Sequence, residues 1–295
     1  MALSPCNSFT DQYGRELVTH GSAAFPIACY HNDLIHDPVP WHWHEELEAA
    51  IITEGAAVLS IGSEKYTVQA GEGFFINTGV LHGACAVDGC HCRIHSLVFH
   101  SKLVGGSEGS VFYQNYLRPL TENPTLEWIP LSPSKGWQCQ ALEALERAWK
   151  TCVDEDSGYE FLVRSALSEL VWILRSQAPA HSRVPNTKRL RDAERIKLML
   201  SCIHENFGSE LNTQMIAASA AVSESECLRC FRSTIGTTPI QYLKQYRIRQ
   251  AALQLSSTND KIAEIAVRCG FQDMSYFTKS FRESYSCTPS EYRKA

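Results

Sequence analysis

Three histidines and one glutamate lie in the first third of the chain, and these residue types bind transition metals. His42 and His44 are separated by one residue, Glu48 follows shortly after, and His82 comes later. Residues i and i+2 of a β-strand point to the same face, so we expect both early histidines to face one side, with Glu48 on that strand or at its edge. Three imidazoles and a carboxylate are a plausible ligand set for Fe, Mn, Ni or Zn.

Two other interpretations of these residues stay open. The histidines could line a pocket for an organic effector without a metal, or they could be buried structural residues. Aromatic side chains nearby could form the walls of a pocket or belong to an ordinary core. These aromatic residues are Trp41, Trp43, Phe74 and Phe75. The predicted effector site comprises His42, Trp43, His44, Glu48, Phe75 and His82.

Short apolar or alternating segments surround the histidines and are typical of β-strands. The predicted strands cover residues 47–53, 56–61, 65–68, 73–76, 83–87 and 93–99. Glycines between them mark turns. Strands of this length and spacing indicate an antiparallel sandwich or barrel, with the histidines facing its interior.

Two stretches of this region resemble the sequence motifs of the cupin family. Residues 42–55 resemble the first motif, H-x-H-x3-E-x6-G. Residues 71–82 resemble the second motif, with Asn77 in place of a proline, and Ala86 stands where that motif ends in asparagine. The resemblance implies a cupin-type antiparallel β-barrel over about residues 20–100. Regulators with cupin-like sensor domains use such histidines either for a metal or to line a ligand pocket.

Two pairs of short amphipathic segments predict two helix-turn-helix motifs near the C-terminus. Residues 213–220 and 225–235 form the first pair. Asn212 and Ser223 are expected to be the N-caps of its helices, and Asp273 the N-cap of the last helix of the second pair. Such caps satisfy backbone N–H groups that a helix start leaves without partners.

The second pair follows a long helix expected at residues 240–255. Its helices meet at Gly270, because glycine tolerates the positive φ of a tight turn. Phe277, Phe281 and Tyr285 fall four residues apart, so they share one buried face and leave a polar and basic face opposite. Two helices joined by a short turn, with such a face on the second, form the unit that enters a DNA major groove.

The segment from residue 262 to residue 293, IAEIAVRCGFQDMSYFTKSFRESYSCTPSEYR, resembles the C-terminal signature of AraC/XylS-type transcription regulators. The resemblance implies a transcription regulator that binds double-stranded DNA and responds to a small-molecule effector in an N-terminal cupin-like domain. It also implies RNA polymerase as a further partner. The sequence does not distinguish an activator from a repressor.

The helix faces expected to meet DNA carry both basic and small polar residues. These residues are Ser225, Leu228, Arg229, Arg232, Met274, Ser275, Thr278, Lys279 and Arg282. Arg229 is the best candidate for reading guanine, because its planar fork matches O6 and N7, and Lys279 is second. Arg232 and Arg282 lie later in their helices and are expected to contact phosphates.

Charge is distributed unevenly along the chain. Residues 187–295 contain 16 Lys and Arg against 11 Asp and Glu, whereas residues 1–186 contain 11 against 21. A basic C-terminal part fits contact with phosphates. No apolar run approaches the ~20 residues of a membrane span, and the N-terminus lacks the pattern of a secretory signal. We therefore expect a cytoplasmic protein with no membrane partner.

The expected fold is α+β and multidomain. A cupin-like ligand-sensing domain is predicted at residues 1–133, a helical pair at 134–177, a linker at 178–187, and an all-α DNA-binding domain at 188–295. The helical pair carries apolar stripes that could pack on each other, on the barrel or on a second copy. In similar regulators this region forms the dimer contact, so a homodimer is expected.

Twelve cysteines are scattered along the chain, and most are expected to be reduced, buried thiols. Cys227 and Cys230 form a C-x-x-C, but helical spacing turns both toward the core, and no second pair follows at zinc-finger distance. The cluster of Cys85, Cys90 and residues 91–92 could serve metal or redox chemistry, but alternating strand positions are the favoured interpretation.

A metal-dependent enzyme is the alternative function. A cupin with these ligands could bind Fe(II) and carry out oxygen or isomerisation chemistry, with the C-terminal helices as a regulatory appendage. The C-terminal signature favours the regulator, so no catalytic residue is predicted.

Overall fold

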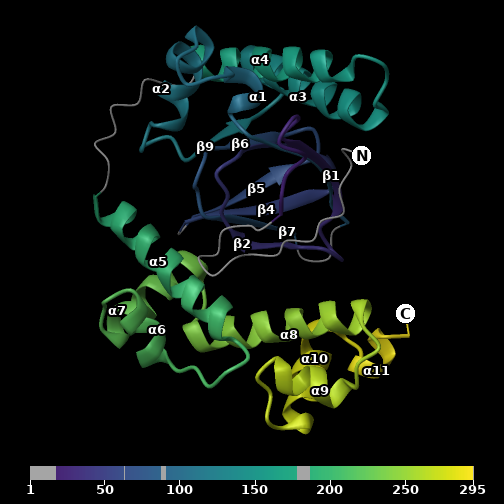
Figure 1. Ribbon diagram of the computed structural model, residues 1–295, viewed down its shortest axis with the longest axis vertical. Helices are drawn as coiled ribbons and strands as arrows, with labels where there is room; N and C mark the ends of the chain where they lie inside the picture. Colours follow the sequence, from purple (N-terminus) through teal and green to yellow (C-terminus); the bar gives the residue numbers. More distant parts are fainter. Residues whose placement is uncertain (1–17, 63, 88–90, 178–186, 295) are drawn as a thin grey trace. The chain divides into compact units, whose positions relative to one another are not determined.

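The structure is a computed structural model that describes residues 18–62, 64–87, 91–177 and 187–294. The chain forms two compact units, and the boundary between them falls after Leu190 (Figure 1). The predicted linker, residues 178–187, lies outside the described residues except for Thr187, where a helix begins.

The first unit is a two-sheet antiparallel β-sandwich. One sheet has the strand order β1-β8-β3-β6-β9 and the other has the order β2-β7-β4-β5. The strands are β1 (Ile27–Asp33), β2 (Val39–His42), β3 (Leu47–Glu54), β4 (Ala56–Ile61), β5 (Glu64–Gln69), β6 (Gly73–Ile76), β7 (His82–Ala86), β8 (Arg93–Phe99) and β9 (Trp128–Leu131). The cupin-like antiparallel fold is thus confirmed. Each of the six predicted strands is present within one residue of its expected bounds, whereas β2 and β9 are too short to show a period.

Side chains of the five-stranded sheet alternate between two apolar layers. On β3, Leu47, Ala49 and Ile51 belong to the core on the outer side of the sheet. Ala50 and Ile52 belong to the core between the two sheets. This alternation follows from the two-residue period of a strand. It decides which residues can face the interior of the sandwich.

Two long helices, α3 (Gly136–Asp154) and α4 (Tyr159–Gln177), lie side by side over the outer side of the five-stranded sheet (Figure 1). Their apolar stripes complete the outer core. The predicted helical pair, residues 134–177, begins two residues before α3 and ends where α4 ends. The preceding segment forms α1 (Lys102–Gly105), η1 (Tyr113–Leu117) and α2 (Arg118–Thr121), which the sequence did not predict.

The second unit is all-helical, as predicted, and α8 (Pro239–Ser257) lies at its centre. The helix contacts α6, α9, α10 and α11. The other elements are α5 (Thr187–Asn206), α6 (Thr213–Ser219), α7 (Glu224–Cys230), η2 (Phe231–Ile235), α9 (Ile262–Arg268), α10 (Met274–Tyr285) and α11 (Pro289–Tyr292). The pairs α6–α7 and α9–α10 are the two predicted helix-turn-helix motifs. No helix in the described part of the chain combines the length and apolar character that crossing a membrane requires.

Local signals in the second unit behave as the sequence predicted. The side chains of Asn212, Ser223 and Asp273 accept hydrogen bonds from backbone N–H groups in the first turns of α6, α7 and α10. Phe277 and Phe281 are fully buried in the core that α8 shares with α9 and α10. The predicted caps and the predicted aromatic face of α10 are therefore confirmed.

We expect Gly270→Ala to destabilise the second unit more than Gly236→Ala. Both glycines have positive φ, +79° and +80°, so alanine costs about 1–2 kcal/mol at either position. A Cβ at position 270 would also lie 2.5 Å from the carbonyl oxygen of Phe207, whereas position 236 has open space around it. Urea unfolding followed by circular dichroism measures both losses. Equal losses would contradict a role for the close approach.

Candidate functional site

The four predicted ligand residues meet between the two sheets of the sandwich. His42 ends β2, His82 begins β7, and the two are register partners in the four-stranded sheet. Glu48 comes from β3 in the other sheet. One candidate ligand atom from each of His42, His44, Glu48 and His82 lies within 4.8 Å of the other three. The four residues therefore do lie together in the fold, and their binding of a metal or an effector stays a prediction.

The strand argument that led to this group is wrong in one respect. The strand β2 ends at His42, His44 lies in the loop that follows, and Glu48 belongs to a strand of the opposite sheet. Both histidines are nevertheless buried, with 3% and 2% of their surface exposed. The site is thus assembled where the chain crosses from one sheet to the other.

Backbone carbonyl groups orient all three imidazoles. The Nδ1 atoms of His42, His44 and His82 lie 2.9, 3.0 and 2.8 Å from the carbonyl oxygens of Pro40, Glu46 and Val80. A carbonyl oxygen only accepts hydrogen bonds, so each Nδ1 carries hydrogen and donates it. The neutral ring then has its lone pair on Nε2. Metal-bound histidines are held in the same way by a hydrogen bond from the other ring nitrogen.

The carboxylate of Glu48 lies against two of these nitrogens. Its Oε2 is 2.9 Å from Nε2 of His82 and 3.3 Å from Nε2 of His44. Burial would raise the pKa of Glu48, but hydrogen bonds from His44 and His82 outweigh burial and hold the pKa well below its ordinary value. A neutral ring that donates from Nδ1 has no hydrogen on Nε2, so a metal cation held between these rings and Glu48 would fit the same arrangement.

The donor set and its spacing fit a divalent transition metal. Imidazole nitrogen and carboxylate oxygen suit Fe, Mn, Ni and Zn. Two atoms bound to one ion at about 2.1 Å are at most about 4.2 Å apart. The 4.8 Å limit of the cluster is only slightly larger. The Nε2 atoms of His82 and His44 already lie 2.9 and 3.3 Å from Oε2 of Glu48, within the spacing of two ligands of one ion.

A small cavity of about 40 Å³ adjoins the cluster inside the sandwich. Besides cluster residues, four buried polar side chains line it, which the sequence analysis missed: His20, Tyr30, Asn32 and Ser96. A signal existed for Asn32 and Ser96, because they are polar residues at inward positions of largely apolar strands. His20 precedes the first strand and gave no such signal.

The predicted aromatic walls are corrected by the structure. Phe74 lines the cavity, but Phe75 and Trp43 do not. Phe75 is fully buried in the outer core beneath α3 and α4, because consecutive strand residues face opposite sides of the sheet. Trp43, which lies between His42 and His44 in the sequence, is half-buried. The prediction that Phe75 and Trp43 contact an effector in this cavity is therefore wrong.

Most residues expected to contact DNA lie at the surface of the second unit. The exposed ones are Ser225, Arg232, Met274, Ser275, Lys279 and Arg282, and the partly buried ones are Leu228 and Thr278. The five on α10 line one continuous face of that helix together with Glu283. Contact with DNA itself remains a prediction for each of them.

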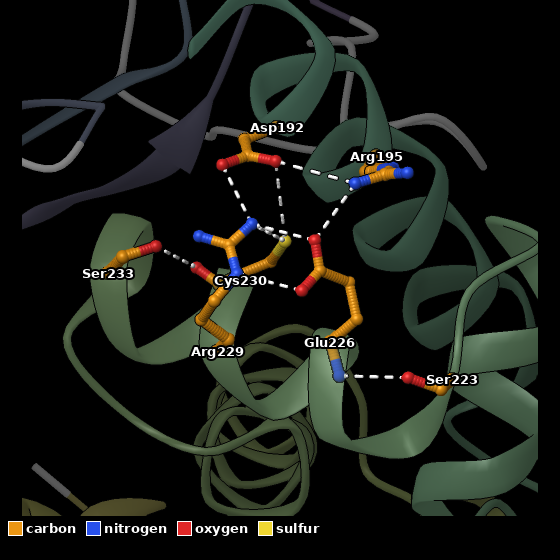
Figure 2. A network of polar contacts seen from close by, with 7 residues as sticks. All are labelled: Asp192, Arg195, Ser223, Glu226, Arg229, Cys230 and Ser233. Atoms are coloured by element: carbon orange, nitrogen blue, oxygen red, sulfur yellow. Dashed lines mark hydrogen bonds and ion pairs between the residues drawn. The ribbon is translucent and has the colours of Figure 1, made fainter. Parts of the chain in front are cut away.

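Arg229 differs from the other DNA-contact candidates because its guanidinium is already bound within the unit. Figure 2 shows it between two carboxylates, with Nε and Nη2 each 2.8 Å from Glu226 and Nη2 2.8 Å from Asp192 of α5. Arg195 lies 2.9 Å from Glu226 and 3.6 Å from Asp192. The hydrogen bonds to Glu226 and Asp192 raise the pKa of Arg229. The guanidinium of Arg229 is thus paired rather than free, and its contact with guanine stays a prediction.

Cys230 completes this ion-pair network. Its Sγ lies 3.4 Å from Nη2 of Arg229 and 3.9 Å from Oδ1 of Asp192 (Figure 2). Asp192, Glu226 and Cys230 also bring ligand atoms within 4.8 Å, but two guanidinium groups already neutralise their carboxylates. The group is therefore a structural network that joins α7 to α5.

The remaining cysteines agree with the expectation of reduced thiols. All cysteines that the structure describes are free, most are buried, and both members of the C-x-x-C are among the buried ones. In the cluster at residues 85–92, Cys90 lies outside the described residues. His91 lies 3.4 Å from carboxylates of Asp33 and Glu54.

Comparison with known proteins assigns each unit to a known domain type. A family model described as an AraC-like ligand binding domain matches residues 25–149, and one described as a helix-turn-helix domain matches residues 216–295. The HTH-type transcriptional regulator YdeC of Bacillus subtilis is 29% identical over 291 residues, which cover 98% of each chain. The HTH-type transcriptional activator RhaR of Mannheimia succiniciproducens is 23% identical over 258 residues, which cover 87% of each chain.

Two solved structures illustrate the range of structural similarity. ToxT from Vibrio cholerae is 12% identical with a TM-score of 0.45, over 91% of this chain and 96% of that one. The DNA-binding domain of AdpA in complex with a target DNA is 27% identical with a TM-score of 0.32, over 34% of this chain and 89% of that one.

We expect Arg229→Ala to lower stability rather than to change base preference. The substitution removes the cation that neutralises Asp192, which is only 13% exposed, and a loss of about 1 kcal/mol is expected. Arg232→Ala, which removes an exposed guanidinium one turn later, is the matched control and should leave stability unchanged. Thermal unfolding and operator-mutant binding profiles measure the two properties. A relaxed preference at one base pair with unchanged stability would contradict the structural role.

Proposed function

Because this chain belongs to the AraC family of DNA-binding transcription regulators, we propose that it senses a divalent transition metal in its ligand-binding domain. His42, His44, Glu48 and His82 would hold the metal between the two sheets. The observation that carries the proposal is that three buried imidazoles, each tied through Nδ1 to a carbonyl oxygen, lie with the Glu48 carboxylate so that one ligand atom of each is within 4.8 Å of the others.

Metal binding would regulate DNA binding by favouring one arrangement of the protein over another. A ligand shifts such an equilibrium only by its difference in affinity for the two arrangements. A tenfold change in DNA affinity requires a difference of about 1.4 kcal/mol. The closing of ligand atoms around a metal, from spacings of up to 4.8 Å, is a structural change that could supply this difference.

His42→Ala and His82→Ala should each abolish metal binding. Wild-type protein is expected to retain about one metal ion per chain after desalting, measured by elemental analysis, and to melt at a higher temperature with Zn²⁺, Mn²⁺, Fe²⁺ or Ni²⁺. A metal at 100 times its Kd would add about 2.7 kcal/mol of stability. His36→Ala, whose imidazole is exposed, is the matched control. No metal content and no thermal shift with any of the four ions would overturn the proposal.

Helix α10 is proposed as the main DNA-contacting element. Its exposed face carries Lys279 and Arg282, and no acidic residue lies in its first turn. Helix α7 instead has Glu224 and Glu226 in its first turn, and its Arg229 is paired. Phosphate attraction is therefore stronger at α10. The 19-residue α8 is about 28 Å long, which supports placing the two motifs in successive major grooves about 34 Å apart.

Lys279→Ala and Arg282→Ala should weaken binding to the DNA upstream of the protein's own gene. Arg282→Ala is expected to weaken all sequences about equally and to reduce the salt slope by about 1, whereas Lys279→Ala should also relax preference at one position, at a cost of about 1–3 kcal/mol. Lys102→Ala, an exposed lysine of the first unit, controls for the change in net charge. Footprinting and salt titration measure the effects. Unchanged affinity in both variants would remove α10 from the interface.

Helix α4 is proposed to mediate a homodimer. Phe161, Leu162 and Trp172 on this helix are 80%, 59% and 55% exposed. Phe161 and Trp172 are eleven residues apart, about three helical turns, and so lie on the same face. Large exposed apolar side chains on one face are typical of protein interfaces. A second copy of the chain would cover them.

Phe161→Ala and Trp172→Ala should weaken self-association at least tenfold in sedimentation equilibrium. Truncation of a large aromatic side chain at the centre of an interface costs about 2 kcal/mol or more. Ile35→Ala, which removes an exposed apolar side chain from a loop outside α4, is the control. A monomeric wild-type protein would reject the dimer, and dimers unaffected by both changes would place the interface elsewhere.

The relatives also bear on whether this protein activates or represses transcription and on whether it is an enzyme. RhaR is named a transcriptional activator, which supports activation here, with RNA polymerase as a partner. The relatives are regulators, which supports a sensor over a metal-dependent enzyme. A regulator that acts on DNA would work in the cytoplasm. A reporter that falls upon metal addition would contradict activation.

A further inference from the structure

The cavity beside the cluster of His42, His44, Glu48 and His82 has one polar wall. Tyr30 on β1 and Ser96 on β8 are cross-strand register partners, and Asn32 lies two residues further along the same face. His20 joins them, with its Nδ1 2.8 Å from the Tyr30 hydroxyl. All four are at most 7% exposed. Four buried polar side chains that line one cavity offer hydrogen-bonding groups to a ligand inside it.

The polar wall and the metal cluster share this cavity. His42, Glu48 and His82 line it as well, and the His20 ring lies 5.6 Å from the His44 ring between centroids. A molecule in the cavity would therefore contact the bound metal on one side and hydroxyl, amide and imidazole groups on the other. Four protein ligands leave positions for outside atoms on a metal that takes six.

The size of the cavity limits the ligand. Its volume of about 40 Å³ is room for roughly three water molecules. A hexose or a fatty acid is several times larger. The space therefore suits a molecule with only a few non-hydrogen atoms.

Charge selects among such small molecules. A divalent metal with one carboxylate, Glu48, and three neutral imidazoles leaves a net charge of +1 inside an apolar sandwich. Uncompensated buried charge is costly, so the site favours a monoanion. Hydroxyl and amide groups on the wall would donate hydrogen bonds to its oxygen atoms.

We propose that the metal site takes a second ligand, a two-carbon carboxylate with an adjacent oxygen atom, of which glycolate is the simplest. Its oxygens bind the metal, and Tyr30, Asn32 and Ser96 hold the side turned away from the metal. This inference rests on the proposed metal site. It makes the regulator a sensor of a small hydroxy- or oxo-acid that requires metal for recognition.

Isothermal titration of metal-loaded wild-type protein with glycolate tests the proposal. One saturable site per chain is expected, and the heat should vanish when the metal is removed with a chelator. Acetate, which lacks the adjacent oxygen, should bind at least tenfold more weakly, and glucose should not bind. Equal affinity for acetate, or tight binding of glucose, would overturn the assignment of the ligand.

Tyr30→Phe and Ser96→Ala test the polar wall. Each removes one hydroxyl and should weaken glycolate binding about tenfold, with metal content by elemental analysis unchanged. Tyr66→Phe removes a hydroxyl from β5, outside the cavity lining, and should change neither quantity. Metal binding without glycolate binding would overturn this inference and leave the proposed function standing. Absence of metal in the wild type would overturn the proposed function and this inference with it.

Discussion

The carboxylate of Glu48, on a side chain that is only 12% exposed, is the constraint on which the ligand-binding unit depends. The side chain occupies an inward position of β3, where Ala50 and Ile52 on the same face belong to an apolar core. A carboxylate there is tolerated only with a cation beside it, because desolvation of an unpaired charge costs several kcal/mol. The Nε2 atoms of His44 and His82 lie 3.3 and 2.9 Å from this carboxylate, and carbonyl oxygens hold both rings by Nδ1. The space between the sheets is thereby kept polar at one end.

Charged side chains also need partners in the second unit. There, several basic side chains are paired with groups of the unit itself. Arg229 and Arg195 neutralise Asp192 and Glu226, and Arg247 donates to the carbonyl oxygens of Phe207 and Ser209. The number of basic residues therefore overstates the charge that faces DNA. On the faces expected to contact DNA, the exposed basic side chains are Arg232 and, on α10, Lys279 and Arg282. The unit thus has two helices, α7 and α10, that differ in the positive charge they expose, and both motifs pack on α8.

Most helices and strands were predicted from the periodic spacing of their apolar residues. Strands such as β3 and β8 have buried residues on both faces and ordinary length, and α3, α4 and α8 have long apolar stripes, so their types and approximate bounds follow from local sequence. The segment of residues 101–133 has short elements without a repeat, and its structure could not be predicted. For the site, residue types and motif spacing identified the four ligands. They did not identify the polar wall, because His20, Tyr30 and Ser96 come from distant segments.

The sequence alone therefore determined the two domain types, the order of the elements, the caps of the DNA-binding helices and the identity of the four clustered residues. Each of these depends on spacing within a short stretch of chain. The tertiary structure decided which of two adjacent aromatic residues, Phe74 or Phe75, faces the cavity, because sheet pairing sets the direction of each strand face. It also decided that Arg229 is bound by Asp192, which lies 37 residues earlier. Contacts between distant segments depend on packing, and no local pattern in the sequence records them.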